Sequence, residues 1–70
     1  MREYRYDGEP VFENGAYRIR FTPWTRLIDL DQVAVVSPYY ENAVTVCLAG
    51  NPECYMLEAS YGDFKRELLG

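Results

Sequence analysis

Two alternating apolar stretches separated by a short break constrain this chain most, because together they predict a β-hairpin. Val44, Val46 and Leu48 alternate with smaller or polar residues, which is the period of a half-buried strand. The Gly-Asn-Pro segment at residues 50–52 interrupts the pattern, and alternation resumes over residues 55–59. The rest of the chain is expected to pack around this hairpin.

The expected register gives the hairpin two unlike faces. A loop centred between Gly50 and Asn51 places Cys47 opposite Cys54, and opposed residues of an antiparallel pair share a face. One face is the expected seat of a helix: Val44, Val46, Leu48, Tyr55 and Leu57. The other is still apolar: Thr45, Cys47, Ala49, Cys54, Met56 and Glu58. We expect the N-terminal hairpin or a second copy of the chain to cover that second face.

A short helix is predicted over residues 60–69. Ser60 suits the N-cap, and Asp63 suits the positive end of the helix dipole. So short a helix persists only by packing, which we assign to Phe64 and Leu68.

The N-terminal part, residues 1–24, is predicted to form a strand and a hairpin. Asn14 and Gly15 indicate a tight type I′ turn. After this turn an amphipathic strand carries Tyr17, Ile19 and Phe21 on one face. Trp24, directly after Pro23, is interpreted as a lid on the core, with an exposed binding anchor as the alternative.

A central meander is predicted over residues 25–59. Residues 33–36 are all apolar, which is typical of a central strand covered on both faces. Residues 38–42 indicate a loop. The sequence thus predicts a single α+β domain over residues 1–70, with a twisted, mostly antiparallel sheet of five to six short strands and one C-terminal helix packed on one face.

The charge distribution favours some partners over others. The net charge is −4, and residues 27–64 contain six acidic and no basic residues. Such a span repels phosphate backbones, which argues against direct nucleic-acid binding. It is either an ordinary solvated surface, or one that mimics nucleic acid or meets a basic patch of a protein.

The sequence contains few residues that could support catalysis or bind a metal ion. The chain has no histidine and only two cysteines, which lack the further ligands of a zinc site. Asp29 and Asp31 could hold a metal, but no third acid is close in sequence, so solvation or loop capping explains them better. No serine has a visible activating base. We therefore expect a protein that is not an enzyme and has no cofactor.

Location and redox state follow from similar arguments. No apolar run is long enough for a membrane span, and the first residues lack the apolar core of a secretory signal. A cytoplasmic protein is expected. Cys47 opposite Cys54 makes a disulfide conceivable, but a reducing compartment favours two free thiols.

Part of the chain resembles small bacterial β-rich domains of the FlbD type. The resemblance is carried by Ile28-Asp29-Leu30 with the run 33–36, by the strand 43–48 with Gly50, and by Glu58-Ala59-Ser60 leading into Phe64 and Leu68. It implies a small non-catalytic domain and transfers no functional residue. The short, acidic, aromatic-rich composition is also similar to that of phage-encoded proteins that block bacterial defence systems.

The leading functional hypothesis is a protein that binds a macromolecular partner, as an inhibitor of a bacterial nucleic-acid-processing or defence complex. The predicted partner-binding residues are Asp29, Asp31, Tyr39, Tyr40 and Glu41. One alternative is a homo-oligomeric sponge for an anionic nucleotide, lined by Arg18, Arg20 and Arg26. Another is a structural homodimer that uses the face of Cys47, Cys54 and Met56.

Overall fold

The computed structural model describes residues 1–70 and contains seven strands, one 3₁₀-helix and one α-helix. The elements are β1 (Arg2–Arg5), β2 (Gly8–Glu13), β3 (Ala16–Phe21), β4 (Thr25–Ile28), η1 (Leu30–Gln32), β5 (Val33–Tyr39), β6 (Ala43–Leu48), β7 (Cys54–Glu58) and α1 (Tyr61–Leu69). The predicted α+β class is confirmed. The strands form three small antiparallel sheets, β1-β4, β2-β3 and β5-β6-β7, in place of the single sheet expected.

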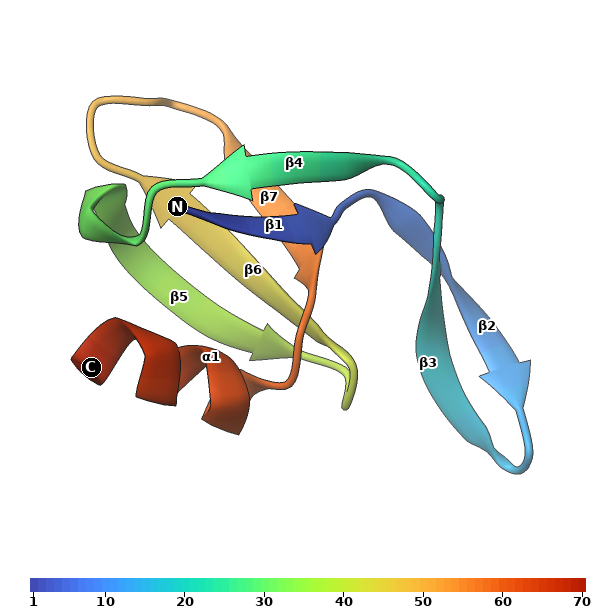
Figure 1. Cartoon of the computed structure of the whole chain (residues 1–70). Coiled ribbons are helices and arrows are strands. Elements are labelled where there is room, and N and C mark those ends of the chain that lie inside the picture. The colour runs from blue at the N-terminus through green and yellow to red at the C-terminus, as the bar shows by residue number, and fades with distance from the viewer.

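The first four strands form one long ribbon with a sharp bend in the middle (Figure 1). β1 pairs with β4, and β2 pairs with β3. At the bend Asp7 has φ of 65°, and Pro23 offers no backbone donor. Bonds from Tyr6 N–H to the Trp24 carbonyl at 3.2 Å and from Thr22 N–H to the Asp7 carbonyl at 3.0 Å hold the two halves together. The bend divides the ribbon into two sheets and makes the β2-β3 hairpin project from the body.

Both hairpin predictions are confirmed in register. Glu13 pairs with Ala16 across the two-residue turn, where Asn14 and Gly15 have φ of 51° and 79°. In the second hairpin Cys47 pairs with Cys54, and Val44, Thr45 and Val46 have the expected partners Leu57, Met56 and Tyr55.

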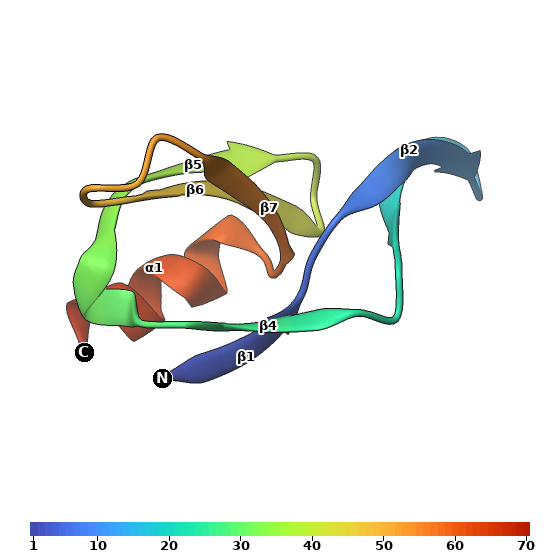
Figure 2. The ribbon, with the colours of Figure 1, turned by 90° about the horizontal axis from the view of Figure 1, so that it is seen from above.

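The helix lies between the three-stranded sheet and the β1-β4 ribbon, as Figure 2 shows from above. The buried cluster takes residues from β4, β6, β7 and α1: Ile28, Val44, Val46, Leu57 and Phe64. Leu48, Tyr55 and Leu68 pack against it, so the predicted helix seat is confirmed. Ser60 caps the helix by accepting from the N–H of Asp63 at 3.2 Å.

The prediction for residues 33–36 is wrong in one respect. The run lies in β5, an edge strand, and Ala34 and Val35 are exposed. An apolar run shows that a strand is present, but its place in the sheet depends on which other segment pairs with it. β5 also continues through Tyr39, so the loop expected over residues 38–42 is reduced to Tyr40, Glu41 and Asn42.

Two further expectations are corrected. Trp24 is no core lid, because it follows the bend and remains 60% exposed. The two cysteines are not free thiols, because Cys47 and Cys54 form a disulfide between paired positions with a Cα–Cα distance of 4.3 Å.

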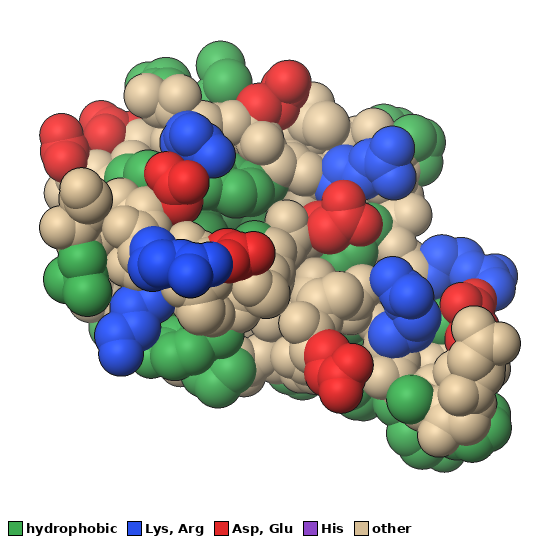
Figure 3. All heavy atoms as spheres, turned by 60° about the horizontal axis from the view of Figure 1, so that its bottom comes forward, with side chains coloured by type: hydrophobic (Ala, Val, Ile, Leu, Met, Phe, Trp, Pro, Cys, Tyr) green, Lys and Arg blue, Asp and Glu red, His purple; other side chains and the backbone are tan.

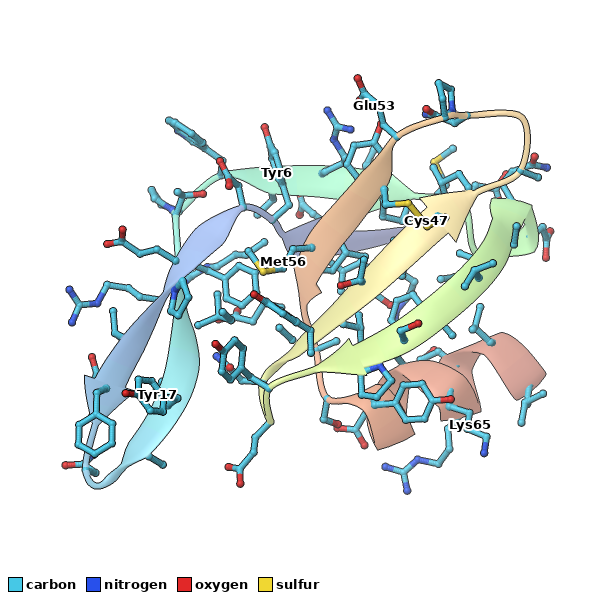
Figure 4. All side chains as sticks on the ribbon, turned by 180° about the vertical axis from the view of Figure 1, so that it is seen from behind. Tyr6, Tyr17, Cys47, Glu53, Met56 and Lys65 are labelled. Atoms are coloured by element: carbon cyan, nitrogen blue, oxygen red, sulfur yellow. A yellow bond between two sulfur atoms is a disulfide. The ribbon has the colours of Figure 1, made fainter.

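The second face of the β6-β7 hairpin is covered at Ala43, half-buried at Thr45, Cys47 and Met56, and open at Cys54 and along β5 (Figure 4). We call this the outer face, with Val35, Ser37 and Tyr39 of β5, Thr45 and Cys47 of β6, and Cys54 and Met56 of β7. Val35 is 55% exposed. The projecting hairpin, expected as a cover, contacts the body where Ile19, within β3, is buried beside Asn42, and at the bend, where Asp7 N–H donates to the Met56 carbonyl.

Candidate partner-binding surface

Two pairs of aromatic side chains stand exposed at the tips of neighbouring hairpins. Phe12 and Tyr17 are opposed residues at the end of β2-β3, with ring centroids 4.9 Å apart in an edge-to-face arrangement, and both are 62% exposed. Tyr39 and Tyr40 form a similar pair at 4.7 Å on the β5-β6 turn, with 40% and 41% exposure. Such pairs offer large, pre-arranged contact area with polar hydroxyls at its edge.

The two tips share a cleft of about 360 Å³, which we call the tip cleft. Its lining residues come from the end of β2-β3 and from the β5-β6 turn: Glu13, Asn14, Ala16, Tyr17, Arg18, Glu41 and Asn42. Figure 3 shows the projecting hairpin with hydrophobic side chains near its far end.

The side chain of Asn42 holds the two tips in place. Its Oδ1 accepts from the N–H of Ile19 at 3.0 Å, and its Nδ2 donates to the carbonyl of Ile19 at 2.8 Å. One side-chain amide thus satisfies both backbone groups of Ile19, which lies beside the β5-β6 turn. This clamp fixes how Tyr17 lies relative to Glu41.

The predicted partner-binding residues do not form one compact patch. Tyr39, Tyr40 and Glu41 lie at the C-terminal end of β5, and Glu41 lines the tip cleft. Asp29 and Asp31 lie at the other end of β5, where the carboxylate of Asp29 caps η1 by accepting from the N–H of Asp31 at 3.1 Å. The capping role that the sequence indicated for this pair is therefore present. The five residues flank a single strand.

The alternative arginine set is divided between two places. Arg18 and Arg20 line a groove of about 360 Å³ together with Arg5 and two acids, Glu13 and Glu58. Arg20 bonds Glu13 at 2.8 Å, and this hydrogen bond holds the pKa of Glu13 below its usual value.

Arg26 is engaged elsewhere. Its guanidinium lies over the rings of Tyr6 and Tyr55, 5.0 and 4.3 Å from their centroids. These two cation–π contacts join β4 to Tyr6 and to β7, and they engage the guanidinium that would otherwise stack on a ligand.

A larger hollow borders the outer face. It measures about 480 Å³ and lies between the end of β1 and β7: Tyr6, Asp7, Glu53, Cys54, Tyr55 and Met56. Its walls combine two acids with apolar side chains. Together with Val35, it extends exposed apolar surface across the sheet.

Sequence reasoning missed the Phe12–Tyr17 pair. The signal was available, because a two-residue turn at Asn14 and Gly15 necessarily places Phe12 opposite Tyr17 at the hairpin end. Pro23 indicates a corner in the chain, but the exposure of the pair depends on the direction in which the bend at Asp7 and Pro23 turns the hairpin relative to the body, and no local pattern predicts that direction.

No group of three or more histidine, cysteine, aspartate or glutamate side chains is placed to hold a metal ion. No helix of the structure combines the length and apolar character that crossing a membrane requires. No protein-family model, curated protein or solved structure matches the chain.

Proposed function

We propose that this chain is a non-enzymatic binding protein whose partner is another protein, engaged at the tip cleft and its aromatic pairs. The observation that carries the proposal is the exposure of Phe12, Tyr17, Tyr39 and Tyr40 on two tips joined by Asn42. Exposed aromatic side chains on a rigid support are typical of interface anchors. Edge-to-face pairing limits the side-chain entropy that each ring loses on binding.

The charges indicate the kind of protein partner. The span 27–64 has acidic residues and no basic ones, and it supplies Glu41 to the tip cleft and Glu53 to the hollow beside the outer face. A partner with a basic contact surface gains from these carboxylates. Nucleic-acid-processing complexes present such surfaces, so inhibition of one by occupying its basic surface is the activity we propose.

Affinity capture with paired variants tests the proposal. Tagged wild-type protein is incubated with a bacterial lysate, and retained proteins are quantified beside those retained by Phe12→Ala/Tyr17→Ala. Truncating one interface anchor to alanine costs about 2 kcal/mol or more, which is roughly 30-fold in affinity, and the costs of neighbouring anchors do not add in general. We therefore expect the double variant to lose at least roughly 30-fold in affinity for the captured partner. Leu69→Ala is the matched control, because Leu69 is also exposed but lies at the end of α1 far from the projecting hairpin (Figure 1).

Two results would contradict the proposal. One is a partner that binds the aromatic double variant as tightly as wild type, with circular dichroism showing both folded. The other is a small molecule retained at stoichiometric occupancy in native mass spectrometry of the wild-type protein, which would support the nucleotide-sponge alternative.

A further inference from the structure

The free edge of β5 carries an inference that rests on the proposed function and specifies how the partner binds. We propose that β5 accepts an extended segment of the partner protein as an additional strand, and that this segment carries basic residues at both ends. The partner is thus recognised by backbone hydrogen bonds along β5 and by charge at its two ends.

The three-stranded sheet has one edge that is partly closed, at β7, and one edge without a neighbour, at β5. β7 is joined to the N-terminal ribbon through the bridge between Tyr6 and Leu57, and Asp7 N–H donates to the Met56 carbonyl at 3.2 Å. β5 lies at the opposite edge. Its first N–H, that of Val33, bonds the Leu30 carbonyl within η1. None of the backbone bonds outside helices and strands involves residues 34–39.

The position of Pro38 shows which way the backbone of β5 is oriented. Pro38 lies opposite Val44 in the ladder and has no N–H, so this pair cannot be of the hydrogen-bonded type. The carbonyl of Pro38 therefore points to the free edge. Hydrogen-bonded and non-hydrogen-bonded positions alternate along a strand, so Val36, two residues before Pro38, is also of the non-hydrogen-bonded type. Its N–H and its carbonyl therefore both point to the free edge. Proline inside a strand is found at such edges, with the position of the missing N–H facing solvent.

The edge also lacks charged side chains, the most common protection against strand addition. Natural proteins place charges, especially lysine, on open edges. β5 is Val-Ala-Val-Val-Ser-Pro-Tyr, which contains no charged residue, and five of its seven residues are exposed. It spans about 23 Å at roughly 3.3 Å per residue. β5 contains two of the usual devices: Pro38, at a position where it removes a single donor, and a register irregularity between Val33 and Val35, which leaves residues 35–39 as the regular part of the edge.

Charge complementarity favours a basic segment of a partner over a second copy of this chain as the added strand. Asp29 and Asp31 precede β5, Glu41 follows it, and none of the three takes part in an ion pair. A second copy paired antiparallel would bring Asp31 of one chain near Glu41 of the other, which is repulsive. An extended segment with lysine or arginine at both ends instead meets a carboxylate at each end.

A designed peptide serves as the probe. It is a fluorescein-labelled peptide in which valine and threonine alternate, with two lysines at each end, and its binding is followed by fluorescence anisotropy. We expect saturable binding by the wild-type protein at low salt. The same peptide with glutamates in place of the lysines, and one with N-methylated backbone amides at alternate positions, should each bind at least ~10-fold more weakly, because one loses the charge match and the other the ladder.

Charge reversal on the protein provides the complementary test. Asp31→Lys/Glu41→Lys should weaken binding of the lysine peptide by about 10-fold or more and strengthen binding of the glutamate peptide. Glu9→Lys is the matched control, since Glu9 is exposed and outside any ion pair but lies in β2, on the projecting hairpin. Equal affinity for the plain and N-methylated peptides would overturn strand addition. If Asp31→Lys/Glu41→Lys bound the lysine peptide as tightly as wild type does, the inference that the partner segment is basic would be wrong. If the protein alone dimerised through β5, the added strand would come from a second copy of the chain and not from a partner.

The two proposals fail in different ways. If no peptide binds while Phe12→Ala/Tyr17→Ala still abolishes capture of a partner, strand addition is wrong and the tip cleft remains. If the lysine peptide binds β5 but the aromatic variant captures its partner normally, the tip cleft is wrong.

Discussion

Asn42 is the residue on which the arrangement of the candidate surface depends most directly. Its single amide bonds both backbone groups of Ile19, 23 positions away in sequence. Ile19 is itself buried, with 2% exposure, so water cannot easily replace these bonds. The projecting hairpin and the β5-β6 turn are thereby held as one unit.

Replacing Asn42 by alanine should lower the free energy of unfolding by about 1–3 kcal/mol, because it leaves the backbone N–H and carbonyl of Ile19 without partners. Urea denaturation followed by circular dichroism measures this. Asn42→Asp keeps an acceptor for the N–H but loses the donor to the carbonyl, so its stability should fall between those of wild type and Asn42→Ala. Equal stability of all three proteins would show that Asn42 does not clamp the hairpin.

Among the elements, α1 depends on its packing more than on its own sequence. It has nine residues, which is too short to persist alone in water. Phe64 is its only buried residue and touches Tyr4 of β1, with ring centroids 5.4 Å apart. The Phe64 side chain thus makes the main buried contact between the helix, the β1-β4 ribbon and the three-stranded sheet, with Leu68 packed beside it and an exposed Arg2–Glu67 ion pair at 3.1 Å.

Phe64→Ala should therefore destabilise the whole domain, since removing a buried phenylalanine side chain costs about 3–5 kcal/mol. For a domain of this size that loss approaches the entire stability, and we expect a largely unfolded protein at 25 °C. Thermal melting monitored by circular dichroism checks it, with Leu69→Ala as the exposed control on the same helix. An unchanged melting temperature would mean that α1 is not anchored as described.

On the scale of the whole molecule, little of the chain is buried. Only 7 of the 70 residues are buried, and the molecule extends 36 × 21 × 19 Å because the hairpin projects. Small domains with limited cores often rely on disulfides for part of their stability. The Cys47–Cys54 bond joins β6 to β7 on the outer face, opposite the core cluster, and takes this role.

Reduction of this bond should lower the free energy of unfolding by about 2–3 kcal/mol, the loop-closure value for a separation of this size. Urea unfolding with and without reductant measures the difference. The free energy of unfolding of Cys47→Ala/Cys54→Ala should equal that of the reduced wild-type protein and should not change when reductant is added. Two titratable thiols in the denatured, unreduced protein would contradict the bond. They would also favour the cytoplasmic location expected from the sequence, because disulfides are rare in that compartment.

Local patterns predicted the secondary structure and much of the pairing. The Asn14-Gly15 turn, the Cys47–Cys54 register and the Ser60 cap each depend on a few neighbouring residues. Turn geometry and side-chain alternation act over short distances, so the sequence alone was sufficient for them.

What the sequence by itself determined is thus a set of strands, turns and one helix, with one face of the β6-β7 hairpin destined for the core. Only the tertiary structure decided which surfaces stay open. β7 takes Tyr6 as its neighbour, which leaves β5 as the free edge, and the bend at Asp7 carries Phe12 and Tyr17 away from the body. Exposure depends on which distant segments meet, and that choice is made by the packing energy of the whole chain.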